Sequence, residues 1–325
     1  MRPVLAILSV TFPFFALILA GYLAARRRML PLEAIPGLNG FVLFFALPCM
    51  LYRFGANTPL ALLLDLSVAT VYLLCGLVMV AFIVAASLNR RVRWNDAAFG
   101  ALVGAFPNTG FMGVPLLVEL LGPSAAGPMI VTLLVDMLVI SSLCIALSRL
   151  DGAGSAGARQ AAGKALRGIV VNPMPWAIVL GIASQAMGLT LWPPLGATLG
   201  LLADAASPVA LFTIGTVLAR SQMLAARGHH AAPPLRDVVP VALVKLVLHP
   251  LLVLLVGASA IQLGLPLTPF ALVVIVLTAA LPSASNVSLL SERFGADTGR
   301  VARIILWSTA AAFFSFSGAV ALMKG

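Results

Sequence analysis

Apolar runs of about 20 residues recur along the whole chain, and each is long enough to cross the ~30 Å hydrocarbon core of a membrane. Hydrophobic residues make up 61% of the 325 residues and charged residues only 9%, more apolar surface than a soluble protein of this length needs. The sequence therefore predicts an all-α integral membrane protein. We expect about ten transmembrane helices, near residues 4–25, 37–54, 62–88, 95–121, 124–148, 169–189, 195–219, 238–263, 268–292 and 301–323.

The basic residues are placed unevenly, because nearly all of them follow the odd-numbered predicted spans. This alternation is the positive-inside pattern, which puts the odd-numbered loops in the cytoplasm and both termini outside. It explains the net charge of +10 as a topology signal at the lipid bilayer and argues against a nucleic acid partner. The clusters are Arg26, Arg27 and Arg28; Arg90, Arg91 and Arg93; Arg149, Arg159, Lys164 and Arg167; Arg220, Arg227 and Arg236; and Arg293, Arg300 and Arg303.

The two halves of the chain resemble each other. A proline is followed seven residues later by a glycine in span two, at Pro48–Gly55, and again in span seven, at Pro208–Gly215. Spans four and nine share an Ala-Phe/Leu-Pro sequence. Five is an odd number, so consecutive five-helix copies have opposite orientations in the membrane, as in many transporters. We predict one five-helix repeat at 1–148, a short cytoplasmic linker at 149–168 and an inverted repeat at 169–325.

Spans four and nine are each interrupted by a proline beside polar residues. Proline removes a backbone hydrogen bond from a helix, and the freed groups survive in a membrane only inside protein or beside water. At 1.5 Å per residue, Pro107 lies ~18 Å and Pro282 ~21 Å into its span, so both breaks are expected near the bilayer midplane. We expect a helix to resume just after each proline and to point its positive N-terminus at the crossing.

Two such N-termini favour a bound anion such as a carboxylate. The alternative is that the polar groups at the breaks only cap one another. On the first interpretation, the helix breaks are Pro107 and Pro282, and the substrate-binding residues are Asn108, Thr109, Ser283, Ser285 and Asn286.

Ionisable residues occur at a similar depth in three other spans: Asp136 in span five, Asp204 in span seven, and Lys245 with His249 in span eight. A charge at the bilayer centre costs roughly 2.5–3.5 kcal/mol, so it is seldom without a role. Asp136, Lys245 and His249 are candidates for a substrate counter-charge or a proton relay, with histidine as the titratable switch. The alternative is a Lys–Asp pair that only joins helices. For Asp204 we expect a structural role.

Enzymatic signatures are missing from the sequence. Cys49, Cys75 and Cys144 lie in apolar runs without a metal-like spacing, and neither an HExxH motif nor a P-loop is present. A G-x-G-x-x-G match at 152–157 lies in the short linker with no strand before it, so we treat it as accidental. We therefore expect neither an enzyme nor a bound cofactor or metal.

The run from Pro107 to Leu116, Pro-Asn-Thr-Gly-Phe-Met-Gly-Val-Pro-Leu, resembles the fourth-helix motif of the auxin efflux carrier family. Segments that begin at Pro48 and at Pro208, and the segments Lys245 to Pro250 and Leu281 to Asn286, match that family in order. The resemblance covers essentially the whole chain and is strongest to the bacterial malonate-transporter-like members.

This resemblance implies ten helices in two inverted repeats, with helices four and nine crossing at their prolines. It implies a transport domain of helices 3–5 and 8–10 that moves against a scaffold of helices 1, 2, 6 and 7, often in a dimer. For a bacterial member it implies the inner membrane.

The expected function is secondary active or potential-driven transport of a small organic anion, a mono- or dicarboxylate, by alternating access. Asn108 and Asn286 would contact the carboxylate, and protons are a candidate coupling ion. A sodium-coupled symporter ranks lower, because neither break motif contains Asp or Glu. An anion channel or a receptor on the same scaffold is the other alternative.

Overall fold

The computed structural model describes residues 2–63, 65–150, 173–227 and 235–324, and every regular element in these ranges is a helix. Six helical segments are long and apolar enough to cross a membrane, which confirms the prediction of an all-helical, multi-pass membrane protein. The predicted linker 149–168 lies outside the described residues from position 151 onward. The six segments are Ile35–Asn57, Ala61–Ser87, Pro123–Leu147, Pro193–Arg220, Leu235–Gln262 and Thr298–Met323.

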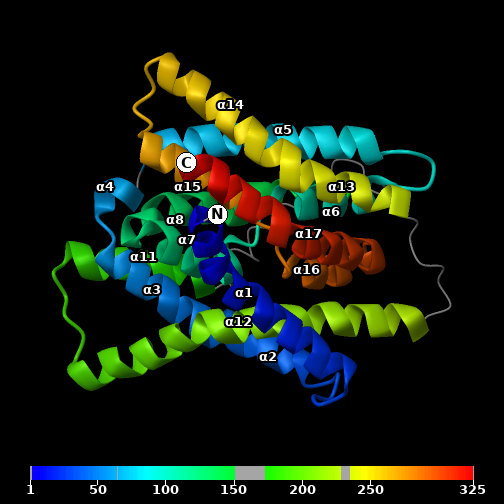
Figure 1. Cartoon of the computed structure of the whole chain (residues 1–325), viewed down its shortest axis with the longest axis horizontal. Helices are drawn as coiled ribbons and strands as arrows, with labels where there is room; N and C mark the ends of the chain where they lie inside the picture. Colours follow the sequence, from blue (N-terminus) through cyan, green and yellow to red (C-terminus); the bar gives the residue numbers. More distant parts are fainter. Residues whose placement is uncertain (1, 64, 151–172, 228–234, 325) are drawn as a thin grey trace.

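The elements follow one another along the chain as α-helices, with short 3-10 or π-helical turns labelled η (Figure 1). The first half contains α1 Arg2–Arg26, α2 Ile35–Phe41, η1 Val42–Ala46, α3 Leu47–Asn57, α4 Leu60–Leu63, α5 Leu66–Ser87, α6 Trp94–Ala105, η2 Thr109–Gly113, α7 Val114–Leu121, η3 Pro123–Ala125, α8 Ala126–Val135, η4 Asp136–Ile140 and α9 Ser141–Leu147. The second half contains α11 Pro173–Ala186, α12 Pro193–Arg227, η5 Leu235–Asp237, α13 Val239–Leu243, η6 Val244–Leu248, α14 His249–Gln262, α15 Pro269–Ala279, α16 Val287–Arg293 and α17 Thr298–Lys324.

Two pairs of helices approach each other closely through glycines. Helix α1 packs along α12, where a Cβ atom on Gly21 or on Gly215 would collide with a backbone carbonyl of the facing helix. Helix α3 packs along α11 in the same way at Gly55 and Gly181. Small residues allow such backbone contact between membrane helices. These four helices form one group, at the lower edge and left of Figure 1.

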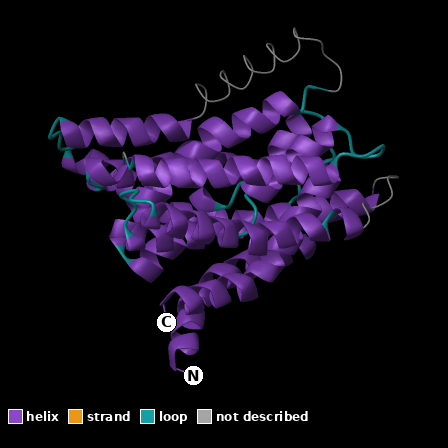
Figure 2. Ribbon diagram, turned by 90° about the horizontal axis from the view of Figure 1, so that it is seen from above, coloured by secondary structure: helices purple, strands orange, loops and turns teal. Residues whose placement is uncertain are grey.

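The other helices form a second group. Helix α5 packs against α6, α8 and α14, and α15 packs against α14 and α8. Helix α17 packs against α6, α13 and α16 and also lies against α1 and α12 of the first group. The beginning of α1 and the end of α17 lie on the same side of the molecule (Figure 2), and the rings of Phe15 and Phe313 meet edge to face with their centroids 5.2 Å apart. This contact connects the two groups of helices.

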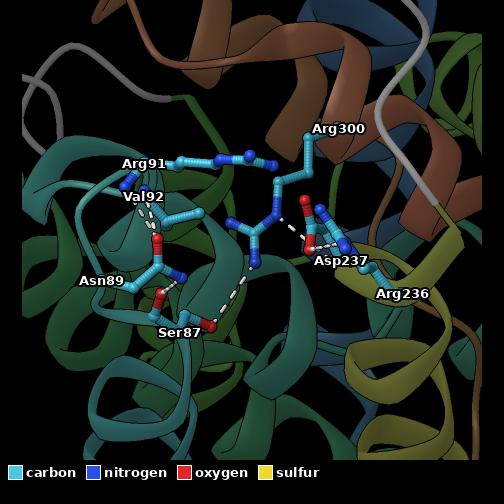
Figure 3. A network of polar contacts seen from close by, with 7 residues as sticks. All are labelled: Ser87, Asn89, Arg91, Val92, Arg236, Asp237 and Arg300. Atoms are coloured by element: carbon cyan, nitrogen blue, oxygen red, sulfur yellow. Dashed lines mark hydrogen bonds and ion pairs between the residues drawn. The ribbon is translucent and has the colours of Figure 1, made fainter.

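A buried arginine joins several helix ends of the second group (Figure 3). Arg300, only 5% exposed, donates from Nη1 to the Asp96 carbonyl at 2.8 Å and from Nε to the Asp237 carbonyl at 3.2 Å. Its Nη2 donates to Ser87 Oγ at 3.4 Å. Gly100 leaves room for the guanidinium, because an added Cβ would lie 2.7 Å from Nη1. One side chain thus connects the ends of α5, α6, η5 and α17.

Candidate functional site

The first break separates α6 from the helix that follows it. Helix α6 ends at Ala105, and Phe106 is extended, with φ −90° and ψ 105°. Proline disfavours a helical conformation in the residue before it, which explains why α6 ends there. Helical structure resumes at Thr109, two positions after Pro107, as the sequence predicts, and the Asn108 carbonyl accepts from the backbone N–H of Met112 at 3.1 Å and of Gly113 at 2.9 Å.

The second break is longer than expected. Helix α15 ends at Ala279 and α16 begins only at Val287, so the prediction that a helix resumes just after Pro282 is wrong. Tertiary hydrogen bonds explain the difference. The N–H of Ser283 donates to Ser308 Oγ at 3.2 Å, and the N–H of Ala284 donates to the Phe106 carbonyl at 3.0 Å. Together with the antiparallel bridge between Pro107 and Ser283, these bonds hold the segment after Pro282 in a non-helical conformation.

The two breaks contact each other directly. Pro107 and Ser283 form an isolated antiparallel bridge, and the Asn108 N–H donates to the Pro282 carbonyl at 2.8 Å. With the bond from Ala284, two backbone hydrogen bonds join segments that are about 175 positions apart in the chain. Backbone groups freed by one proline break are therefore satisfied by the other break.

Several polar side chains at this crossover are left without partners. In the part of the chain that the structure describes, Thr109 Oγ1, Ser283 Oγ and Asn286 Oδ1 are buried and make no hydrogen bond. Asn108 and Ser285 are also buried, and the Asn108 side chain does not cap the turn that follows it. Buried polar atoms are rarely left unpaired, so these groups are available to a ligand. In the alternative interpretation these side chains cap one another, but the Thr109, Ser283 and Asn286 oxygens make no such hydrogen bonds.

A small cavity of about 20 Å³ lies beside the crossover. Asn108, Ala284 and Asn286 line one side, while Leu47 of α3 and Met174 of α11 line another. The cavity therefore lies between the crossover and the glycine-packed group of helices. Its volume has room for about one water molecule, so an organic anion fits only after the surrounding helices move apart.

A second buried polar cluster lies in the same group of helices as the crossover. The Tyr72 hydroxyl donates to Asp136 Oδ2 at 3.0 Å, and the centroids of the Tyr72 and His249 rings are 5.9 Å apart. Lys245 Nζ lies 3.2 Å from His249 Nδ1 and donates to the Ala279 carbonyl at 2.6 Å. All four side chains are buried. The structure thus brings Asp136, Lys245 and His249 together, as a relay requires.

Tyr72 was not predicted as part of this cluster. Its only sequence signal is a hydroxyl in the middle of the apolar helix Leu66–Ser87, where a buried O–H needs a partner. The contacts of Lys245 also differ from those of a simple Lys–Asp pair, because its amine bonds to the Ala279 carbonyl and lies beside His249 Nδ1. Asp204 instead forms a partly exposed ion pair with Arg53 at 2.6 Å, in agreement with the expected structural role.

Three π-helical turns carry candidate residues: η2 begins with Thr109, η4 begins with Asp136, and η6 contains Lys245. A π turn widens the helix, because its backbone hydrogen bonds span one residue more than in an α-helix. At η4 the Asp136 carbonyl accepts from the Ser141 backbone N–H and also, at 2.9 Å, from the Ser141 hydroxyl. Such turns are frequent at functional sites. A fourth π turn, η1, carries no candidate residue.

Comparisons with known proteins agree with this arrangement. The sequence model of a family described as "Membrane transport protein" matches residues 6–320. The chain belongs to this family, which is that of the auxin efflux carriers. It is therefore a membrane transporter and not an enzyme.

Relatives of this transporter occur in bacteria and plants. It is 30% identical to a "Putative malonate transporter" of Rhizobium meliloti (strain 1021), over 98% of this chain and 96% of the relative. It is 26% identical to the "Uncharacterized transporter YfdV" of Escherichia coli (strain K12), over 88% of each chain. It is 23% identical to "Auxin efflux carrier component 8" of Arabidopsis thaliana, over 85% of this chain and 86% of the relative. The resemblance to auxin efflux carriers is confirmed.

Proposed function

We propose that the protein is a secondary active or potential-driven transporter of a small organic anion, a mono- or dicarboxylate such as malonate. The observation that carries this proposal is the crossover: two paired helix breaks with unpaired Thr109 and Ser283 hydroxyls and an unpaired Asn286 Oδ1 atom. The two hydroxyls can donate to a carboxylate without any fixed positive charge, whereas Asn286 would have to contact the anion through its amide nitrogen, because Oδ1 only accepts. The relative named as a malonate transporter supports a dicarboxylate.

The ten-helix inverted repeat is part of the proposal. We take α1, α2–α3, α11 and α12 as spans one, two, six and seven. The repeat then relates span one to span six and span two to span seven. It therefore maps the contact between α1 and α12 onto the contact between α11 and α3. Gly55 and Gly215, which end the two matching Pro-to-Gly motifs, lie at these equivalent contacts. This supports repeats at 1–148 and 169–325, a scaffold of these four spans and a transport domain of α5–α9 and α13–α17.

Orientation follows from charge. We infer from the basic clusters that the odd-numbered loops face the cytoplasm and both termini the periplasm, in a bacterial inner membrane. The common side of the start of α1 and the end of α17 (Figure 2) supports an even number of crossings. The same orientation puts the Arg300 network of Figure 3 at the cytoplasmic ends of the transport helices.

Transport requires the transport domain to move. The cavity is narrow and lies between the crossover and the scaffold residues Leu47 and Met174. A change of conformation there would expose the crossover to each side of the membrane in turn. The narrow cavity favours a carrier of this kind over an open channel.

The test is uptake of radiolabelled malonate into proteoliposomes that contain the purified protein. We expect saturable uptake, and at least a tenfold lower rate for Asn108→Ala and for Asn286→Ala. Asn57→Ala is the control, because its exposed amide lies at the end of α3 and donates to the Arg53 carbonyl of the same helix. If both crossover variants transport malonate like the wild type, the proposed site is misplaced.

A further inference from the structure

Arginines gather at the cytoplasmic end of the proposed scaffold, where α1 and α12 pack together. The apolar segments Thr11–Arg26 and Pro193–Arg220 each end at an arginine. Ala25 and Ala219, the residues just before these two arginines, are fully buried in the same small hydrophobic cluster. The two arginines therefore lie at the same level of neighbouring helices, where the apolar part of each span gives way to the headgroup region of the membrane.

The turn after α1 adds Arg27 and Arg28 to this group. Arg28 has φ 56°, and every other described residue with positive φ is a glycine. The Arg28 N–H donates to the Ala25 carbonyl at 3.1 Å, and the N–H of the next residue donates to the Ala24 carbonyl at 2.9 Å. This is a Schellman cap, in which glycine is the usual residue at the position of Arg28. An arginine kept in a strained conformation points to a role for its side chain.

These guanidinium groups have no acidic partner among the described residues. Arginines 26–28 are exposed and form no ion pair there, and the Nε atom of Arg220 is buried without a hydrogen bond. Arginines at the ends of the transport helices differ: Arg149 lies over the Phe294 ring, 5.1 Å from its centroid, and Arg300 bonds to two carbonyls. Both sets fit the positive-inside pattern, but the scaffold arginines are left open to an anion outside the protein.

A lipid phosphate is the anion that fits this arrangement. A guanidinium presents paired N–H donors that match the geometry of phosphate oxygens. Basic clusters just cytoplasmic of membrane helices, and basic pockets between such helices, bind the anionic headgroups of lipids. The side chain of Met29, next to Arg28, is 72% exposed, so an apolar group accompanies the charges. The surface therefore offers contacts to both the phosphate and the hydrocarbon of a lipid.

We propose that Arg28 and Arg220, together with Arg26 and Arg27, bind the phosphodiester headgroup of an anionic phospholipid in the cytoplasmic leaflet. The site belongs to α1 and α12, so the lipid would anchor the scaffold, against which the transport domain moves. This inference goes beyond transport of an organic anion, because the lipid binds far from the crossover and its binding is measured without a transported substrate.

The experiment measures thermal unfolding of the purified full-length protein in neutral detergent with increasing mole fractions of phosphatidylglycerol. We expect this lipid to raise the unfolding temperature of the wild type, whereas phosphatidylcholine, which has no net charge, should not. Arg28→Gly and Arg220→Gln should each raise the half-maximal lipid fraction about fivefold. Without lipid, Arg28→Gly should unfold at the same temperature as the wild type or higher, because glycine removes the strain of the cap.

The matched control removes two exposed charges from the loop between α5 and α6, through Arg90→Gln combined with Arg91→Gln. This variant should respond to phosphatidylglycerol like the wild type. Equal weakening in the control would show that only net charge matters, and would overturn the proposal. Equal stabilisation of the wild type by phosphatidylcholine would also overturn it.

Inorganic phosphate without lipid separates a lipid site from a site for a soluble anion. We expect phosphate alone to leave the unfolding temperature of the wild type unchanged, and full stabilisation by phosphate would contradict the assignment to a lipid. If Arg220→Gln gives no folded protein, Arg28→Gly decides alone, since glycine suits the backbone conformation at that position. An unchanged response of Arg28→Gly to phosphatidylglycerol would then overturn the proposal.

Discussion

Single polar side chains inside the second group of helices carry the functional argument. Asp136 bonds to Tyr72 through one oxygen, and its other oxygen has no partner among the described residues; the same holds for His249 Nε2. An ionisable group at membrane depth costs several kcal/mol unless it is paired. These unpaired atoms are the places where a proton could bind or leave during transport.

Replacement of Asp136 by asparagine tests proton coupling at this position. The amide keeps the size of the side chain and its bond to Tyr72 but cannot exchange a proton. We therefore expect Asp136→Asn to lose malonate accumulation driven by an imposed pH gradient, while exchange of internal for external malonate continues. Uptake driven equally well in the variant and the wild type would exclude the relay. Asp65→Asn is the control, because asparagine can replace Asp65 as the N-cap of α5.

The sequence predicts the individual candidate residues because polar residues are easily recognised within long apolar segments. Asn108 and Asn286 stand beside prolines, and Lys245 and His249 lie four positions apart on one helix. Their partners were not predictable in the same way. Tyr72 lies on a separate helix from Asp136, and the Ala279 carbonyl is a backbone group with no sequence signal of its own.

The helices themselves depend on special backbone positions. Pro107 and Pro282 correctly predict two interrupted helices. The length of the second interruption was not predictable, because it depends on bonds from Ser283 and Ala284 to partners elsewhere in the fold. Local sequence predicts where both helices stop and where the first one resumes, whereas tertiary contacts lengthen the second break.

Gly215 provides a test of the close contact between α1 and α12. An alanine there would place a methyl group against the Ile18 carbonyl, and the two backbones would have to separate. We expect Gly215→Ala to reduce the yield of folded protein severely, as judged by size-exclusion chromatography. Gly200→Ala in the same helix is the control, because nothing lies within 4 Å of the added methyl group. It should be neutral or stabilising by up to about 1 kcal/mol. A normal yield for Gly215→Ala would contradict this packing.

Arg300 tests how the ends of the transport helices are held together. Arg300→Met removes the donors to the Asp96 and Asp237 carbonyls and to Ser87, and leaves these groups without the guanidinium. We expect a loss of about 3 kcal/mol of stability, seen as a lower unfolding temperature. The exposed Arg293 in α16 is the control, and Arg293→Met should change little. Similar unfolding temperatures for both variants would mean that the network of Figure 3 contributes little.

On the scale of the whole molecule, the proposed mechanism needs two bodies that move relative to each other. The sequence indicates the two halves through the Pro48–Gly55 and Pro208–Gly215 motifs. It does not indicate how helices of the two halves intermix into the two groups seen in the structure, because that depends on contacts between distant segments such as α1 and α12.

Cross-linking can test whether the proposed transport domain moves against the proposed scaffold. Phe15 and Phe313 connect α1 to α17, so a short bifunctional reagent that joins cysteines at these positions should stop uptake until the link is cleaved. Tyr22 and Gln222, whose side chains are 2.6 Å apart, both belong to the proposed scaffold. A link between cysteines there should leave uptake intact. The background would lack Cys49, Cys75 and Cys144. Unimpeded uptake across a complete 15–313 link would contradict the proposed movement.

The most direct test of the account is equilibrium binding of radiolabelled malonate to the purified protein. The account predicts saturable binding to the wild type that weakens at least tenfold, or ~1.4 kcal/mol, when Asn108 and Asn286 are both replaced by alanine. Asn57→Ala should bind like the wild type. Unchanged affinity in the correctly folded double variant would contradict the claim that the paired helix breaks form the anion site.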